Sequence, residues 1–384
     1  MNAPSPRLKV LTVVGTRPEI IRLSAVIKRL DEHVDHVLVH TGQNYDYELN
    51  EVFFEDLGLR RPDHFLEADT STLGAVLGSI LIKTEQVLLA ERPDAMLILG
   101  DTNSSISAII AKRMKIPVFH MEAGNRSFDE NVPEETNRRL VDHVADYNLV
   151  YSEHARRNLL GEGLHPSRIM LTGSPMLEVV NQNREGLSAS RILETEALQP
   201  RWYFLVSLHR EENVDHPGRL ASILHGLQRI SSQYELPVLV STHPRTRKRV
   251  ESLEEKFEGL HFHKPFGFHD YLALQTSAAL VLSDSGTIAE EASILHFPAV
   301  TLRDAIERPE AQDTGSILLT GTDEDSIARV VAYALQTAHE RDSYEDRPAA
   351  YGVANTSHRA VSFILSTTPT HHERLSIRKV TNDA

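Results

Sequence analysis

The sequence predicts an α/β protein built from two doubly wound domains that face a cleft. Its 384 residues are enough for two domains, each with its own core. Apolar runs of strand length alternate with segments of helical period, and continuous apolar strands indicate parallel sheets covered on both faces. The whole pattern occurs twice along the chain, which predicts two such sheets.

The strands of each domain are the apolar runs themselves. In the first half they lie at 8–15, 36–40, 95–100, 117–120, 147–151 and 169–172. Helical-period segments between them include 20–30, 72–90 and 104–115. In the second half the apolar runs lie at 203–207, 237–241, 278–282, 298–302 and 316–320.

A turn and a polar stretch separate the two halves. The turn includes Gly173 and Pro175, and residues 181–190 are polar, which predicts a hinge and linker. We therefore expect an N-terminal domain of residues 1–174 plus 355–384 and a nucleotide-binding C-terminal domain of residues 175–354. A last helix at 356–366 is expected to pack back on the first domain, and the polar residues 367–384 to fray.

Composition excludes several functions. A formal net charge of -14 argues against nucleic-acid and anionic-membrane partners, whose surfaces require an excess of Lys and Arg. The chain has no cysteine, so disulfides, thiolate nucleophiles and Cys-ligated zinc are excluded. The N-terminal segment of residues 1–7 is short and polar and has no apolar core of a signal peptide. No run along the chain approaches the length of about 18 apolar residues that a transmembrane helix requires. These features predict a soluble, cytoplasmic protein.

The segment 278–291 is typical of a nucleotide-diphosphate site. An apolar run ends at Asp284, a turn of Ser285, Gly286 and Thr287 follows, and a helix then begins with two carboxylates. The N–H groups and dipole at a helix N-terminus favour a phosphate. Glu291, further into the helix, is placed to reach a ribose, and Arg308, from beyond the next strand, to pair with the diphosphate.

Polar residues follow several strands in the first half, where ligands of doubly wound sheets bind. Arg17 stands in Gly-Thr-Arg-Pro-Glu at 15–19, a motif that also fits an ordinary capped helix start. Asp101 either caps the next helix or points into the cleft. Glu122 comes directly after a strand and does not stand in the first turn of a helix, so a capping role or an interaction with a helix dipole does not explain it. Glu134, in a first helical turn, is also explained as a dipole partner.

The second half adds His209 at a strand end and His243 at the next one. The basic run at 245–249 is interpreted mainly as a solvated helix face. A dinucleotide fingerprint is missing, because Gly161 and Gly163 lack a third glycine and follow no strand. Carboxylates and a His opposite a nucleotide sugar indicate acid/base chemistry on the sugar, and no cluster has the spacing of a metal site.

Seven motifs occur together and in order, and they resemble the non-hydrolysing UDP-N-acetylglucosamine 2-epimerase family over roughly residues 8–321. The motifs are Gly-Thr-Arg-Pro-Glu at 15–19, Gly-Asp-Thr at 100–102, His-Met-Glu-Ala-Gly at 120–124, Pro-Glu-Glu-Thr-Asn-Arg at 133–138, His-Arg-Glu-Glu-Asn at 209–213, Asp-Ser-Gly at 284–286 with two Glu at 290–291, and Glu-Arg-Pro-Glu at 307–310.

The resemblance implies two Rossmann-like domains in a glycosyltransferase-B-like arrangement, with UDP held mainly by the C-terminal one. It implies inversion at C2 of a UDP-2-acetamido sugar by elimination of UDP to a 2-acetamidoglycal and re-addition, with no cofactor and no metal. It also implies a homodimer. The residues that match the family's acid/base set are Asp101, Glu122, Glu134 and His209. Those that match its UDP-holding set are Arg17, Arg22, Ser285, Gly286, Glu291 and Arg308, and His243 is expected to line the same cleft.

Four positions depart from the common pattern. Arg22 replaces a Lys, Asn44 a His, Glu211 an Arg and Thr287 a Gly. Positions 44 and 211 belong to the family's activating second-substrate site, so the departures put that regulation in doubt. With the segments 128–133 and 173–176, they resemble a subgroup in capsule and O-antigen synthesis. That subgroup interconverts UDP-2-acetamido-2,6-dideoxy-L-talose and UDP-N-acetyl-L-fucosamine; the alternative pair is UDP-GlcNAc and UDP-ManNAc.

Three other functions fit a UDP site on this fold. One is a glycosyltransferase, which leaves the convergence of acid/base groups unexplained. A second is the hydrolysing branch of the family, which releases UDP and free N-acetylmannosamine. The third is a non-catalytic nucleotide-sugar sensor. Solvent deuterium at C2 discriminates among them.

Overall fold

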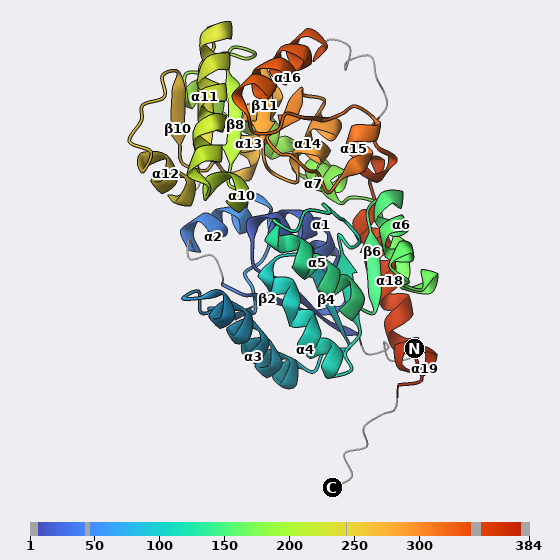
Figure 1. Ribbon diagram of the computed structural model, residues 1–384. Coiled ribbons are helices and arrows are strands. Elements are labelled where there is room, and N and C mark those ends of the chain that lie inside the picture. Colours follow the sequence, from blue (N-terminus) through green and yellow to red (C-terminus); the bar gives the residue numbers. More distant parts are fainter. Residues whose placement is uncertain (1–6, 43–46, 243, 339–346, 378–384) are drawn as a thin grey trace. The chain divides into compact units, whose positions relative to one another are not determined.

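The chain forms two compact units (Figure 1), and the computed structural model describes residues 7–42, 47–242, 244–338 and 347–377. The first unit contains residues 1–125, 133–179 and 353–384, and the second contains residues 126–132 and 180–352. Each unit is a parallel sheet covered by helices. The prediction of two doubly wound α/β domains is confirmed.

The first unit has a seven-stranded parallel sheet in the order β3-β2-β1-β4-β5-β6-β7. Its order reverses between β1 and β4, which pair directly, and ligands of such sheets bind beyond the strand ends at this switch point. The strands are β1 Lys9–Val14, β2 Asp35–His40, β3 His64–Phe65, β4 Ala95–Leu99, β5 Val118–Met121, β6 Tyr147–Val150 and β7 Ile169–Leu171.

Helices cover both faces of this sheet. In Figure 1, α3, α4 and α5 lie side by side along one face, and α1 contacts α18. Buried Leu11, Val13, Met96 and Ile98 of the central strands form the core with Val141. The helical segments are α1 Arg17–His33, α2 Tyr47–Asp56, α3 Leu73–Glu91, the 3₁₀ helix η1 Asn103–Ser107, α4 Ala108–Arg113, α5 Pro133–Val144, α6 Glu153–Gly161, η2 Pro166–Arg168, α18 Thr356–Thr367, η4 Thr368–Thr370 and α19 His371–Arg374.

The second unit has a six-stranded parallel sheet in the order β10-β9-β8-β11-β12-β13, which reverses between β8 and β11. Its strands are β8 Phe204–Leu208, β9 Val238–Thr242, β10 Leu260–His263, β11 Leu280–Ser283, β12 Ala299–Thr301 and β13 Leu318–Leu319. Its helices are α8 Arg184–Ala189, α9 Ile192–Thr195, α10 Glu211–Val214, α11 Pro217–Tyr234, α12 Pro244–Glu251, α13 Phe268–Ser277, α14 Ile288–Leu295, α15 Pro309–Asp313, α16 Glu324–Gln336 and η3 Ala349–Gly352.

Helices α11 and α16 pack together on the second sheet. Leu224 of α11 and Val331 of α16 are fully buried in one cluster with Val206 and Leu282 of the central strands. Burial of side chains of this size stabilises each by about 1.5–3 kcal/mol relative to exposure. The core therefore fixes β8 and β11, whose ends carry the predicted site residues of this unit.

The connection between the units is helical, which differs from the predicted linker at 181–190. Helix α7, Met176–Gln182, spans the boundary between Val179 and Val180, and α8 follows it. The buried side chains of Met176, Val179 and Val180 anchor α7, so its few polar residues do not make it a loop. The segment 126–132 belongs to the second unit. The pKa of Asp129 in this segment is lowered mainly by hydrogen bonds from Asn131, and the charges of Arg219 and Arg303 lower it further.

Residues after 366 are also more ordered than predicted. Helix α18 packs in the first unit, where Phe363 contacts the rings of Phe119 and Tyr147. Residues 368–374 continue as η4 and α19, and the buried His371 meets the Tyr147 hydroxyl at 3.1 Å. The prediction that the chain frays after residue 366 is therefore wrong for residues 368–374, because an aromatic cluster holds this segment.

Helix α3 exposes large apolar side chains together with Glu85 and Gln86. By length and composition alone it could cross a membrane, although 28% of the relevant window is buried and Lys83 and Glu85 interrupt it. The expectation that no run approaches about 18 apolar residues concerned uninterrupted runs, and residues 83–86 divide the apolar pattern of this helix. Leu73 is 68% exposed, and Ile82 and Leu89 are each 60% exposed.

Candidate functional site

The loops after β1 and β4 lie at the switch point of the first sheet. The loop after β1 leads through Gly15 and Thr16 into α1, whose first residue is Arg17. The Arg17 guanidinium lies 5.5 Å from the centre of the Phe53 ring of α2, a cation–π distance. The loop after β4 carries Gly100, with φ of +70°, and then Asp101. The predicted Arg17 and Asp101 thus stand on neighbouring loops.

Glu122 directly follows β5 and has a φ of +64°, a conformation that is uncommon for a residue with a side chain. Its carboxylate forms an ion pair with Arg22 of α1, whose side chain is 3% exposed. A Cβ atom placed on Gly100 would lie 3.9 Å from Glu122 Oε2. Glu122 therefore belongs to the same cluster as the Asp101 loop, and Arg22 holds it there.

Helix α5 supplies the partner of Asp101. Arg138 forms an ion pair with the Asp101 carboxylate and a second one, at 2.9 Å, with the buried Glu135. Asn137 donates its side-chain N–H to the Asp101 carbonyl at 3.0 Å. Glu134 lies half-buried in the first turn of the same helix. Asp101 is thus held by charge and by hydrogen bonds from α5.

A buried imidazole joins the loops after β4 and β5. His120 Nε2 donates to the Gly100 carbonyl at 2.8 Å. His120 Nδ1 lies 3.0 Å from Asp142 Oδ1, without the alignment of a hydrogen bond. Asp142 in turn accepts the Gly124 N–H at 3.1 Å. Gly124 has no room for a side chain, because a Cβ would lie 2.4 Å from the Ala155 carbonyl oxygen.

In the second unit, His209 follows β8 and is oriented by Asp284, which follows β11. Its Nδ1 lies 3.0 Å from Asp284 Oδ1, and its side chain is 42% exposed whereas Asp284 is fully buried. Asp284 also accepts the backbone N–H groups of His209 and Arg210 at 3.0–3.1 Å, together with the Asn213 side chain at 3.2 Å. Burial by itself raises the pKa of Asp284, but the His209 charge and these hydrogen bonds lower it below its ordinary value.

The turn between β11 and α14 is closely packed. The Ser285 and Thr287 hydroxyls lie 2.9 Å apart, and Ser285 Oγ accepts the Thr287 N–H at 3.3 Å. A Cβ on Gly286 would lie 3.1 Å from Glu307 Oε1, so this position favours glycine. Glu307 is itself paired with Arg210 at 3.0 Å. The N-terminus of α14 is thus presented by a small, half-buried turn, as an anion site requires.

Buried partners hold the two other predicted UDP-binding side chains of this unit. Glu291 accepts the Gln275 side-chain N–H at 2.6 Å. Arg308 is 2% exposed and lies 3.4 Å from Glu290 Oε1. Next to it, Glu310 accepts the Tyr351 hydroxyl at 3.0 Å, and burial raises the pKa of Glu310. Arg308 therefore lies among the carboxylates Glu290 and Glu310. We expect it to bind the diphosphate as a further anion.

Two predicted positions, His243 and Asn44, lie outside the described residues. Sequence reasoning missed two positioning groups, Asp284 as the partner of His209 and Arg138 as the partner of Asp101. Both pairs join residues far apart in the chain. The sequence signal for these two partners was their position inside motifs, Asp284 in the motif at 284–286 and Arg138 in the motif at 133–138.

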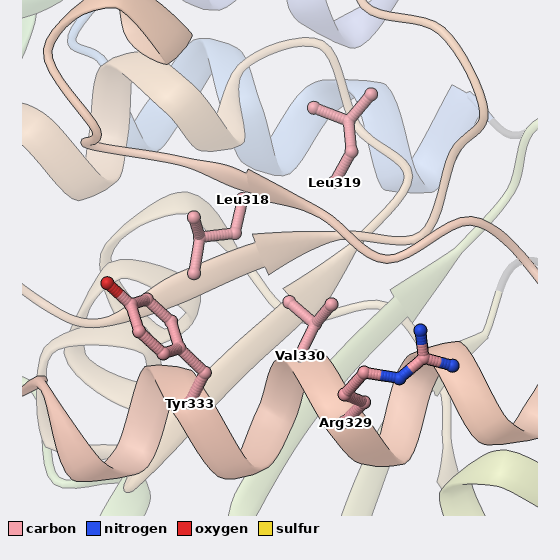
Figure 2. A pocket seen from close by; sticks show the side chains of 5 residues that line it. All are labelled: Leu318, Leu319, Arg329, Val330 and Tyr333. Atoms are coloured by element: carbon pink, nitrogen blue, oxygen red, sulfur yellow. The ribbon is translucent and has the colours of Figure 1, made fainter.

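A hollow of about 330 Å³ lies elsewhere in the second unit (Figure 2). It is lined by Leu318, Leu319, Arg329, Val330 and Tyr333, from β13 and α16. In Figure 2, Leu318, Val330 and the Tyr333 ring point toward one another, whereas Leu319 points to the other side of its strand. None of the predicted site residues that the structure describes lines it, so it is not the candidate site.

Comparisons with known proteins identify the family and the fold. A family model described as UDP-N-acetylglucosamine 2-epimerase matches residues 28–365. The solved UDP-N-acetylglucosamine 2-epimerase of Rickettsia bellii is 43% identical, covers 97% of this chain and 100% of its own, and superposes with a TM-score of 0.89. The Methanocaldococcus jannaschii UDP-GlcNAc 2-epimerase in complex with UDP-GlcNAc and UDP is 35% identical, covers 94% and 100%, and has a TM-score of 0.86. The UDP-2,3-diacetamido-2,3-dideoxy-D-glucuronate 2-epimerase of Pseudomonas aeruginosa is 35% identical, over 93% of this chain and 99% of its own.

Two parallel-sheet domains with carboxylates and an imidazole at their strand ends define a two-domain α/β enzyme of the glycosyltransferase-B-like class. The chain belongs to the UDP-N-acetylglucosamine 2-epimerase family. It is an isomerase of the 2-epimerase type.

Proposed function

We propose that the protein is a non-hydrolysing 2-epimerase of a UDP-2-acetamido sugar. The observation that carries the proposal is that each unit has an acid/base group at its switch point and that a charged partner fixes this group in place. Asp101 is paired with Arg138 in the first unit, and His209 is paired with Asp284 in the second. A UDP-sugar substrate is supported by the relative solved in complex with UDP-GlcNAc and UDP.

The chemistry explains why several proton-transfer groups are needed. The C2 proton is not acidic, since no carbonyl is adjacent to it. A base removes this proton while the C1–O bond breaks, so the electron pair of the C2–H bond forms the C1–C2 double bond and UDP leaves as an anion. An acid then protonates C2 on the opposite face, and UDP adds back at C1. General acid–base catalysis of this kind contributes about 10²–10⁴-fold in rate.

The roles follow from this scheme. Asp101, Glu122, Glu134 and His209 are the groups we assign to proton transfer. Arg17, Arg22, Ser285, Gly286, Glu291, Arg308 and His243 are those we assign to UDP. Arg22 forms an ion pair with Glu122, so it also holds that carboxylate in position. UDP must stay bound between the two steps, and exclusion of water from the site prevents hydrolysis.

The sugar we propose is UDP-2-acetamido-2,6-dideoxy-L-talose, converted into UDP-N-acetyl-L-fucosamine for capsule or O-antigen synthesis. The support is the set of departures from the common family pattern. Glu211, in place of Arg, binds Arg245 at 2.7 Å and so changes the charge of this surface. Thr287, in place of Gly, adds a hydroxyl to the turn before α14. The alternative substrate pair is UDP-GlcNAc and UDP-ManNAc. UDP sugars are cytoplasmic metabolites, and we place the enzyme in the same compartment.

The test follows C2 by NMR in deuterated water, with each of the two UDP sugars in separate reactions. We expect deuterium at C2 with UDP still attached, and a higher kcat/KM for the 6-deoxy sugar. A higher kcat/KM for UDP-GlcNAc would overturn the choice of sugar and leave the reaction type intact. Accumulation of free sugar would indicate the hydrolysing branch. Binding of both sugars without deuterium incorporation would overturn the enzymatic proposal in favour of a sensor.

We also propose that the protein is a homodimer that buries the outer face of α3. Leu73, Ile82 and Leu89 project from this helix with 60–68% of their surfaces exposed. Exposed apolar patches of this kind mark interaction sites in soluble proteins. Burial against a second copy removes the patch from water, which is the largest favourable term in such an association.

Replacing Ile82 with Glu is therefore expected to convert a dimer into a monomer. The measurement is molar mass by light scattering after size-exclusion chromatography, with the unfolding midpoint recorded alongside. Tyr333→Glu is the matched control, since Tyr333 is a 56% exposed apolar side chain in the second unit. A native protein of monomeric mass, or an Ile82→Glu variant that remains dimeric, would contradict this interface.

A further inference from the structure

Glu19 is a buried carboxylate that the reaction scheme does not use. It lies in the first turn of α1, 1% exposed, two residues after Arg17. Its Oε2 accepts the Gly15 N–H at 3.0 Å and the Thr16 hydroxyl at 2.8 Å. These two donors belong to the loop that follows β1.

The other oxygen of Glu19 faces the neighbouring loop. Its Oε1 accepts the Thr102 hydroxyl at 3.1 Å and the Ser104 hydroxyl. Thr102 directly follows Asp101, and the Thr102 and Ser104 hydroxyls lie 2.6 Å apart. One buried side chain thus joins the loops on the two sides of the β1/β4 switch point.

The second unit repeats this arrangement at its own switch point. Asp284, after β11, accepts the N–H groups of His209 and Arg210 after β8. In both sheets a buried carboxylate crosses between the loops of the two central strands and touches the residue next to a proton-transfer group or the group itself. A simple helix-capping role does not require Glu19 to reach Thr102 and Ser104.

We propose that Glu19 is a positioning residue that holds the Asp101 loop in register with the Arg17 loop. The inference rests on the roles proposed above for Asp101 and Arg17. Four donors converge on the carboxylate and fix its orientation, so each loop is defined relative to the other. A displacement of about 1 Å at a reacting group costs about 10²-fold in rate, which makes such a connection valuable. Burial also raises the pKa of Glu19 to about 7, against the effect of these four hydrogen bonds.

The test uses Ser104→Ala, which removes one donor to Glu19, and Ser107→Ala as its matched control. Ser107 is a buried serine of the same 3₁₀ helix, and its hydroxyl donates to the Ser104 carbonyl at 2.6 Å rather than to Glu19. Ser107→Ala loses one buried hydrogen bond, whereas Ser104→Ala loses the bond to Glu19 and the 2.6 Å contact with the Thr102 hydroxyl, so stability is expected to fall in both variants and is measured alongside. Only Ser104→Ala is expected to lower kcat, by about tenfold or more, with KM and UDP affinity within a few-fold.

Two Glu19 variants complete the test. Glu19→Leu removes the connection and is expected to lower kcat by about 10²-fold. Glu19→Gln is expected to restore most of this loss, because its amide carbonyl can accept the Gly15 N–H while its NH₂ group donates to the two hydroxyls. The double variant Glu19→Leu/Ser104→Ala is expected to be no slower than Glu19→Leu, since both changes break the same connection.

A readout besides activity separates this proposal from the proposed function. Amide hydrogen exchange of residues 100–107, followed by mass spectrometry, is expected to be faster in Ser104→Ala and Glu19→Leu than in Ser107→Ala. Equal exchange and equal kcat in Ser104→Ala and Ser107→Ala would overturn the role of Glu19. Absence of C2 deuterium in the native protein overturns the epimerase proposal instead, and the amide-exchange comparison still tests Glu19.

Discussion

Asp101→Asn is expected to lower the rate of deuterium incorporation at C2 by about 10²–10⁴-fold. The Asn side chain has nearly the same shape, and its carbonyl oxygen can still accept from Arg138, but it cannot take up or release a proton. Affinity for UDP is expected to stay within a few-fold, because Asp101 is assigned to the sugar. The measurements are NMR of C2 and calorimetric titration with UDP.

Asp94→Asn is the control for this variant. Asp94 stands at the opposite, amino end of β4 and accepts the Lys9 backbone N–H at 2.8 Å. Its substitution changes a carboxylate at the other end of the same strand and is expected to leave the rate unchanged. Retained deuterium incorporation in Asp101→Asn would remove Asp101 from the proton-transfer set. A large loss of UDP binding would show instead that Asp101 serves the nucleotide.

The second large effect is expected for His209→Ala, also about 10²–10⁴-fold in C2 deuterium incorporation. The half-exposed imidazole is oriented by the buried Asp284, so one ring nitrogen is fixed and the other is available for proton transfer. Removal of the ring leaves the helix N-terminus of α14 intact, and UDP affinity is therefore expected to change only a few-fold. The same two measurements decide the outcome.

His216→Ala provides a matched histidine control in the same unit. His216 Nδ1 accepts the Arg219 N–H at 3.2 Å and caps α11. Loss of an N-cap costs about 1 kcal/mol of stability and no chemistry. If His209→Ala and His216→Ala retain the same rate, His209 is structural; if His209→Ala loses UDP binding with its activity, its assigned role is wrong.

Much of the fold follows from local pattern. The continuous apolar runs that end at Val14, Leu99 and Leu208 are strands because only a sheet covered on both faces buries every side chain of such a run. The two strands that the sequence did not reveal, β3 and β10, each lie at one edge of their sheet. An edge strand has a neighbour on one side only, so β3 is two residues long and β10 carries two histidines in four residues.

The connection at 176–189 shows the limit of composition. The polar residues at 181–190 favoured a linker, but the buried Met176 and Val179 set the helical state of α7, which continues to Gln182. Burial against a distant part of the chain overrides local polarity, and a single sequence does not reveal which distant part is present.

The sequence by itself determined the class of fold, the seven motifs and the residue types that stand at the strand ends. These are consequences of hydrophobic period and of turn chemistry, which act over a few neighbouring residues. Only the tertiary structure decided which side chains hold one another. Arg138 with Asp101, Arg22 with Glu122, and Asp284 with His209 are ion pairs between residues 37 to 100 positions apart. Parallel strands place the loops that carry Asp101, Glu122, His209 and Asp284 at the carboxyl edges of their sheets, and helices α1 and α5 supply the two arginines. Strand order and helix packing are properties of the whole chain.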